Sequence, residues 1–256
     1  MSSQLEKFLL ADVNSRTKES LINYKLFYDL KLSAALDGYD LSLYTPDVDR
    51  DGFDIILDDR DSVRKIQLKT VLITNKKDKR AATTSSWDIH KAILRPDMEF
   101  CSRLGFESSP FGVGVQGGVI LILIDVSESG LSISYAYTDI FVITALHLGL
   151  VHKTPKIRKN VFENFYAGVK EGISSEKIAV PRSLFVDAVS PEHLLGLMSL
   201  HNRIGYGWWH HLLTIGENEY VRTLDASTIA VSLRILRGYV ADELLKLTSG
   251  LSKPQP

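Results

Sequence analysis

Apolar residues recur with helical spacing over residues 15–36. Ile22, Leu26 and Leu30 follow one another at four-residue steps and so fall on one stripe, and Gly38 follows where a helix would end. The pattern predicts a long amphipathic helix that buries this stripe. Glu19 lies three residues before Ile22 and so on the same stripe, and we therefore expect its side chain to face inward near the start of the helix.

The next stretch carries strand patterns separated by polar turns. Residues 40–44 alternate between apolar and polar, residues 53–57 are apolar apart from Asp54, and residues 63–74 mix apolar and polar positions over a longer stretch that is typical of a strand. The polar segments 47–52 and 58–62 between them are rich in Asp, Gly and Ser, which favour turns. The pattern predicts three strands, of which the last two form a hairpin.

A polar, basic stretch follows the third predicted strand and leads into a predicted short helix. Ser85, with Asp88 three residues later, resembles a capping box, and Pro96 would close a helix that runs through Leu94. Residues 119–126 are almost wholly apolar, as in a buried strand, and the alternating residues 131–138 are predicted to be its antiparallel neighbour.

Beyond Asp139 the pattern becomes mainly helical. Ser190-Pro191 is typical of a helix start, and residues 225–247 predict another long helix. The order of elements predicts an α/β, restriction-endonuclease-like three-layer core with a mixed sheet at residues 15–137. Residues 138–248 would form a mainly helical extension packed on this core, followed by a disordered tail at residues 249–256.

Composition limits the classes of function. The chain has 256 residues and a formal net charge of −1, so any contact with nucleic acid must come from local basic patches. The single cysteine, Cys101, excludes an internal disulfide. Neither a signal peptide nor an uncharged apolar stretch long enough to span a bilayer is visible, so we expect a cytoplasmic protein that does not insert into membranes.

Three polar residues of the predicted hairpin converge on one small volume. Asp54 lies at the start of one strand, and Gln67 and Lys69 project from the same face of the other strand because side chains alternate. Asp54 can ligate Mg²⁺, and the Gln67 side-chain oxygen and the Leu68 carbonyl can complete part of the shell. Lys69 can orient or deprotonate the attacking water.

This pattern resembles the PD-(D/E)xK nuclease superfamily, in particular its Mrr-type restriction-endonuclease branch. The resemblance rests on Gly52-Phe53-Asp54 followed by Gln67-Leu68-Lys69, with Gln67 in place of the commoner acidic residue. It implies a helix–strand–strand–strand–helix–strand core, dependence on Mg²⁺ with Mn²⁺ as a substitute, and hydrolysis of DNA phosphodiesters. A glutamate from the first helix often joins the metal site in this family, and Glu19 is the candidate here.

Basic side chains could meet the phosphates of DNA at two places. Lys76, Lys77, Lys79 and Arg80 directly follow the strand that carries Lys69, so they would flank the scissile phosphate. A second cluster comprises Lys153, Lys156, Arg158 and Lys159, for which a solvated helix or loop surface is the simpler interpretation.

Simpler interpretations apply to the other residues too. Asp54 and Lys69 could be a turn-forming acid and a cation on a half-buried strand, and Glu19 could complement a helix dipole. Residues 47–58 approach a calcium-binding EF-hand loop, but strand patterns stand where its two helices should be. His210 and His211 are adjacent and diverge on a helix, which favours core packing or an oligomer interface over a metal site.

The sequence therefore predicts a DNA-cleaving, metal-dependent endonuclease, of the kind found in restriction or defence systems. One alternative is a module that keeps the nuclease fold and binds nucleic acid or assembles without catalysis. Another is a calcium-stabilised interaction domain. A homodimer through the helical extension is a further expectation.

Overall fold

The computed structural model describes most of the chain. The described residues are 4–46, 52–73, 85–95, 117–127, 130–151, 153, 155–171, 176–205, 207, 209–217 and 226–249. The predicted tail therefore lies almost wholly outside the described part.

The predicted first helix is confirmed. After α1 (Gln4–Leu10) and the 3-10 turn η1 (Asp12–Asn14), helix α2 spans Ser15–Leu36. Its buried stripe consists of Ile22, Leu26, Leu30 and Ala34. The helix ends before Gly38, whose φ of +78° is a conformation that residues with a side chain rarely adopt.

The predicted hairpin and its neighbours are also present. The strands are β1 (Ser42–Tyr44), β2 (Ile55–Asp58), β3 (Val63–Ile73), β5 (Gly117–Ser127), β6 (Gly130–Thr138) and β8 (Val186–Ala188). They form one six-stranded sheet in the order β1-β2-β3-β5-β6-β8. Within this sheet β3 and β5 run parallel, whereas the other neighbours are antiparallel. The predicted α/β class with a mixed sheet is confirmed.

The prediction of a helix through residues 85–94 is wrong for its first half. Residues Ser86–His90 form strand β4, and only Lys91–Leu94 are helical, as the single turn α4. β4 pairs antiparallel with β7 (Lys177–Pro181), almost ninety residues later in the chain. Because the pairing partner is so distant, the local resemblance of Ser85 and Asp88 to a capping box could not reveal the strand.

The remaining elements are the helices α6 (Ile140–His147), α7 (Lys159–Lys170), α8 (Pro191–Leu197), α9 (Trp209–Glu217), α10 (Ala226–Thr248) and the 3-10 turn η3 (Arg182–Leu184). The Ser190 hydroxyl caps α8 by accepting from the His193 amide, as the Ser-Pro pattern predicts. The prediction of a mainly helical region missed β7 and β8. No helix in the described part of the chain has the length and apolar character needed to cross a membrane.

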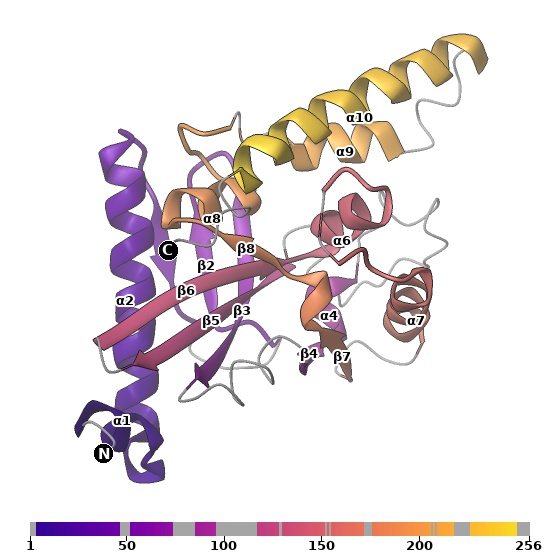
Figure 1. Cartoon of the computed structure of the whole chain (residues 1–256). Helices are drawn as coiled ribbons and strands as arrows, with labels where there is room; N and C mark the ends of the chain where they lie inside the picture. Colours follow the sequence, from indigo (N-terminus) through magenta and orange to yellow (C-terminus); the bar gives the residue numbers. More distant parts are fainter. Residues whose placement is uncertain are drawn as a thin grey trace.

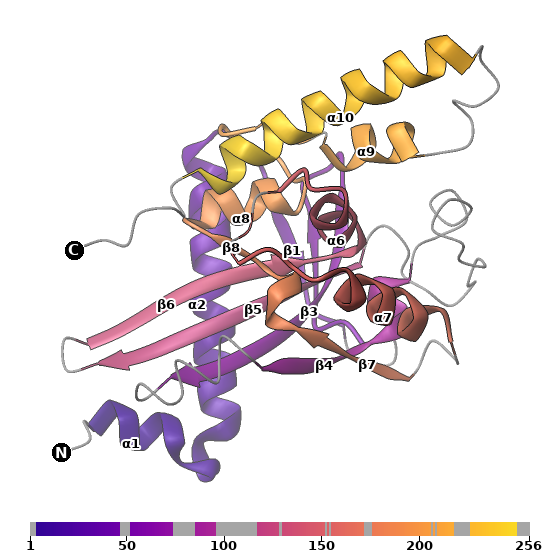
Figure 2. The same ribbon diagram turned by 45° about the vertical axis from the view of Figure 1, so that its right-hand side comes forward.

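The helices gather around different parts of the sheet. In both Figure 1 and Figure 2, α2 runs along the sheet, and α8, α9 and α10 stack at one end of it. α7 lies near the β4–β7 pair, with the Arg95 Nε donating to the Val169 carbonyl at 2.8 Å. The Lys91 amino group donates to the Glu171 carbonyl at 2.7 Å. Two cations thus satisfy carbonyls at the C-terminal end of α7, where the helix dipole favours positive charge.

A buried polar cluster joins α6 and α9 to the end of β6. The Asp139 carboxylate caps α6 by accepting from the Val142 amide at 2.6 Å, and it also accepts from the Tyr137 hydroxyl at 2.7 Å. The His210 Nε2 lies 3.1 Å from the same carboxylate, without the alignment of a hydrogen bond. The neighbouring Arg64 Nε donates to the Met198 carbonyl at 2.6 Å, which ties β3 to the end of α8.

Burial makes this cluster sensitive to acid. Desolvation lowers the pKa of His210 from 6.5 to about 4, although the nearby Asp139 carboxylate opposes the shift. Between these two pH values the unfolded chain binds a proton on His210 that the folded chain does not bind. The free energy of unfolding should therefore fall by up to about 3 kcal/mol from this group as the pH drops from 6.5 to 4. His210→Phe should remove that part of the decline, measured by urea unfolding at several pH values.

His211 is exposed beside it, so His211→Phe controls for the loss of an imidazole at the surface. A His210→Phe protein that loses stability in acid as steeply as the unaltered chain would contradict this account.

Candidate functional site

Asp54 stands immediately before β2, at the point where the β2–β3 hairpin ends. Regular pairing of β2 with β3 ends at Ile55. The backbone N–H of Asp54 nevertheless donates to the Ile66 carbonyl at 2.8 Å, which keeps Asp54 against β3. The turn at the other end of the hairpin is closed by the Asp59 amide, which donates to the Ser62 carbonyl at 3.2 Å. The hairpin thus fixes the position of Asp54 relative to β3.

The Asp54 side chain satisfies a peptide group that β2 leaves unpaired. Peptide groups of alternate strand residues point to the same neighbour, so Leu68, like Ile66, turns its N–H and C=O toward the β2 side. β2 is too short to reach Leu68, and the Asp54 Oδ2 accepts from the Leu68 N–H at 2.5 Å. A carboxylate and the Leu68 carbonyl therefore lie on the same side of β3, beyond the point where its described pairing with β2 ends.

Gln67 is buried, with 6% of its surface exposed, and its side chain has a structural partner. The Gln67 Oε1 accepts from the His90 N–H at 3.2 Å, which holds the end of β4 against β3. An amide oxygen has two lone pairs, so this hydrogen bond leaves room for one further contact. The hydrogen bond from His90 nevertheless occupies one of the two acceptor positions of the Gln67 oxygen.

Lys69 lies two residues further along β3, on the same face as Gln67. Its side chain is half-buried and forms no hydrogen bond or ion pair with any residue that the structure describes. Because Lys69 has no carboxylate partner among the described residues, its amino group can contact a substrate without first breaking an ion pair there. This is the property that a catalytic or phosphate-binding lysine needs.

The structure contradicts the expected orientation of Glu19. The buried stripe of α2 begins at Ile22, and the Glu19 side chain is exposed. Helical spacing places Glu19 on the stripe, but the packing that covers the stripe does not extend to the first turns of the helix. Glu19 therefore does not face inward, and the described contacts do not bring it to Asp54.

Several other predicted residues fall outside the described part of the chain. These are Cys101, the basic residues Lys76, Lys77, Lys79 and Arg80, and most of the acidic turn at residues 47–51. The EF-hand interpretation is nevertheless wrong, because β1 precedes this turn and β2 and β3 follow it. An EF-hand loop requires a helix on each side.

His90 is a residue of this site that the sequence analysis missed. A Cβ atom added to Gly52 would lie only 2.5 Å from the His90 ring, so the ring packs directly against the backbone two residues before Asp54. The His90 amide also holds Gln67. The alternation of Trp87 and Ile89 with polar neighbours was the available signal for a strand that would end at His90.

The donor set bears on which metal could bind. Within the described ranges, no group of three or more His, Cys, Asp or Glu side chains is placed to hold a metal ion. The site offers the Asp54 carboxylate and the Leu68 carbonyl, both hard oxygen donors. Mg²⁺ suits such a site, because it keeps several water ligands and is held through one or two carboxylates and the substrate phosphate.

Comparisons with known proteins identify no family. No family model matches the chain, and searches of curated proteins and of solved structures gave no significant match.

The contact between Asp54 and Leu68 predicts a measurable structural role. Asp54→Ala removes the acceptor of the Leu68 N–H and should lower the free energy of unfolding by about 1 kcal/mol, whereas Asp54→Asn keeps an acceptor oxygen and should cost less. Urea unfolding measures both. Asp88→Ala, at an exposed position of β4, is the control and should change stability by less than about 0.5 kcal/mol. Equal stability of the Asp54→Ala variant and the unaltered chain would contradict the contact.

Proposed function

We propose that the chain is a metal-dependent nuclease that hydrolyses DNA phosphodiesters at Asp54, Leu68 and Lys69. The observation that carries the proposal is the hydrogen bond from the Leu68 amide to the Asp54 carboxylate, which holds an acid against β3 at the residue that precedes Lys69. An acid, a backbone carbonyl and a lysine that has no partner among the described residues are the groups that this chemistry uses.

The topology around the site supports the same proposal. α2 is followed by the antiparallel strands β1, β2 and β3, and the crossover through β4 and α4 leads to β5, which is parallel to β3. This order corresponds to the helix–strand–strand–strand–helix–strand core implied by the resemblance to Mrr-type nucleases, with a strand and one helical turn described in place of the crossover helix. In a core of this kind, Asp54 before β2 and Lys69 in β3 would be the acid and the lysine of the site.

Each side chain then has a defined task. Asp54 and the Leu68 carbonyl would hold Mg²⁺, and Mg²⁺ when bound would neutralise phosphate charge and acidify a water molecule. Lys69 would orient the attacking water or stabilise negative charge on the phosphate. Gln67 positions the strand through His90 and contributes at most one neutral oxygen. With one carboxylate in the described site, affinity for Mg²⁺ should depend strongly on the phosphate of bound DNA.

A specific observation favours a second candidate, a non-catalytic module that binds DNA on the same fold. The oxygen of Gln67, which stands where an acidic residue is commoner, accepts from the His90 backbone instead of pointing only toward a metal. Glu19 is exposed and adds no second carboxylate. A site with a single carboxylate could retain affinity for phosphate after losing hydrolysis.

Cleavage assays with site variants test the proposal. The unaltered chain should cut duplex or single-stranded DNA with Mg²⁺ or Mn²⁺ and should be inactive with EDTA. Asp54→Asn and Lys69→Ala should each reduce the rate by at least about 100-fold, because each removes a group that acts on the reacting phosphate. Circular dichroism and urea unfolding should show that both variants remain folded.

Lys31→Ala is the matched control, since Lys31 is an exposed lysine of α2 and its removal should leave cleavage unchanged. DNA binding without cleavage by the unaltered chain would replace the nuclease proposal with the non-catalytic candidate. Cleavage that survives Asp54→Asn would show that the activity does not use this site.

A further inference from the structure

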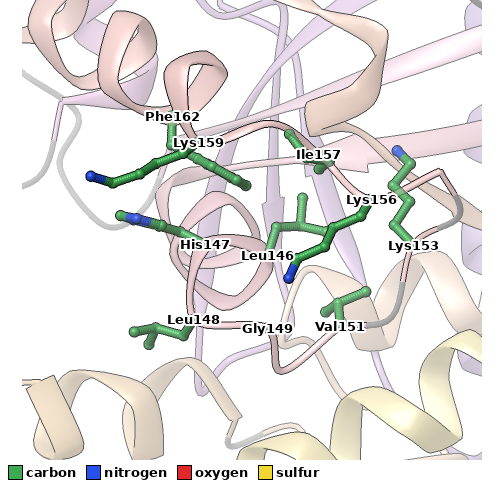
Figure 3. Close-up of a pocket in the computed structure, with 10 residues that line it drawn as sticks. All are labelled: Leu146, His147, Leu148, Gly149, Val151, Lys153, Lys156, Ile157, Lys159 and Phe162. Atoms are coloured by element: carbon green, nitrogen blue, oxygen red, sulfur yellow. The ribbon is translucent and has the colours of Figure 1, made fainter.

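A pocket of about 680 Å³ lies between the end of α6 and the start of α7. Its wall begins at Leu146 and His147 in the last turn of α6, continues through the connection that carries Val151 and Lys156, and ends in the first turn of α7. Figure 3 shows these segments curving around the open space. A concave site of this size is in the range that encloses a small organic ligand.

The charged side chains at this pocket are all basic within the described part of the chain. Lys153, Lys156 and Lys159 line it together with His147, and no described Asp or Glu is among the lining residues. Lys159 is 83% exposed and lies 3.1 Å from Glu163, a surface ion pair that contributes little. The formal net charge of the chain is −1, so this concentration of cations is local. The pocket therefore favours an anionic ligand.

Two of the lysines have different roles. The Lys153 amino group donates to the Ser183 carbonyl at 2.8 Å and to the Phe185 carbonyl, which makes it part of the pocket wall. In Figure 3 its amino group points away from the centre of the pocket, whereas Lys156 extends toward Leu146. Lys156 is exposed and forms no hydrogen bond or ion pair with described residues. Lys156 is therefore the cation best placed to bind a ligand.

The first turn of α7 adds hydrogen-bond donors. The residue that precedes the helix, Arg158, provides no side-chain cap, and the Val161 amide bonds to the Arg158 carbonyl. The amides of Lys159 and Asn160 precede the first amide that can bond within the helix, and the helix dipole favours negative charge at this end. In Figure 3 the Lys159 amino group points away from Lys156, and its exposed side chain would turn inward to hold a phosphate group together with Lys156 and these amides.

The rest of the wall is apolar or aromatic. Leu146, Val151, Ile157 and Phe162 line the pocket, and the His147 ring stacks on Phe162 with 4.8 Å between ring centres. Inorganic phosphate would leave these apolar surfaces without a partner. A ligand that joins a phosphate to a flat, weakly polar body would cover both parts of the wall.

We propose that this pocket binds a nucleotide, with its phosphates at Lys156, Lys159 and the start of α7 and its base against the apolar wall beside His147. The proposal is independent of the nuclease activity assigned to Asp54. A small molecule fits the concave shape better than duplex DNA, whose phosphates usually meet extended basic surfaces.

Isothermal titration calorimetry on the full chain with EDTA present tests the proposal. The probes are AMP, ADP, ATP and GTP, with adenosine, inorganic phosphate, pyrophosphate and a 20-base-pair DNA duplex for comparison. At least one nucleotide should bind more tightly than pyrophosphate, and adenosine should not bind measurably. The double variant K156A/K159A should weaken nucleotide binding at least about 30-fold, because each charged contact to phosphate contributes roughly a factor of ten.

K177A is the matched control, since Lys177 is an exposed lysine of β7 outside the pocket, and it should leave nucleotide binding unchanged. K156E, a single substitution at an exposed position, should weaken binding in the same direction and guards against a folding defect in the double variant. Pyrophosphate binding as tight as that of any nucleotide, binding of the duplex alone, or nucleotide binding unchanged in K156A/K159A would each overturn the proposal. So would the absence of binding by every nucleotide.

Discussion

The unequal lengths of β2 and β3 are the constraint on which the candidate site depends. β3 pairs along nine residues with β5 but with only four residues of β2, so no strand that the structure describes pairs with the β2 side of Leu68. An unpaired peptide group in a central strand is costly, and the Asp54 carboxylate satisfies its N–H. The same hydrogen bond therefore fixes an acid at Leu68, the residue between Gln67 and Lys69 in the sequence. The hydrogen bond between Leu68 and Asp54 thus serves both the sheet and the proposed metal site.

The parallel pairing of β3 with β5 has a second consequence. Parallel neighbours require a long crossover, and the described part of this crossover supplies β4 and α4. The end of β4 then meets β3 through the bond from the His90 amide to Gln67. β4 is held in turn by β7, and Lys91 and Arg95 hold the end of α7. The segment after residue 138 thus supports the strand that carries Gln67 and Lys69, although it contributes no predicted catalytic residue.

Much of the fold could be predicted because its signals are local. The stripe of α2, the β2–β3 hairpin, the apolar β5 with its neighbour β6, and the Ser-Pro start of α8 all follow from patterns within a few residues. β4, β7 and β8 could not be predicted in this way, since short strands are defined by partners distant in the sequence. Glu19 shows a related limit. Helical spacing gives the face of a residue, but it does not show how far along the helix that face is covered.

For the candidate site, the sequence predicted on which strand each residue lies and which residues share a face, but not the hydrogen bonds between them. Alternation placed Gln67 and Lys69 on one face, and the turn before β2 placed Asp54 nearby. The bond from Leu68 to Asp54 depends on where β2 stops pairing, and the bond from His90 to Gln67 depends on a strand that the sequence analysis missed. The sequence analysis missed His90 because His90 ends β4, the strand that was predicted to be helical.

Metal binding at Asp54 is the central claim, and crystallography with Mn²⁺ tests it most directly. Crystals of the chain with a short DNA duplex, soaked in Mn²⁺, should give an anomalous peak within about 2.5 Å of an Asp54 carboxylate oxygen and close to the Leu68 carbonyl. A phosphate oxygen of the DNA should complete the shell. DNA bound across β3 without an anomalous peak beside Asp54, or with the peak at another site, would contradict the account.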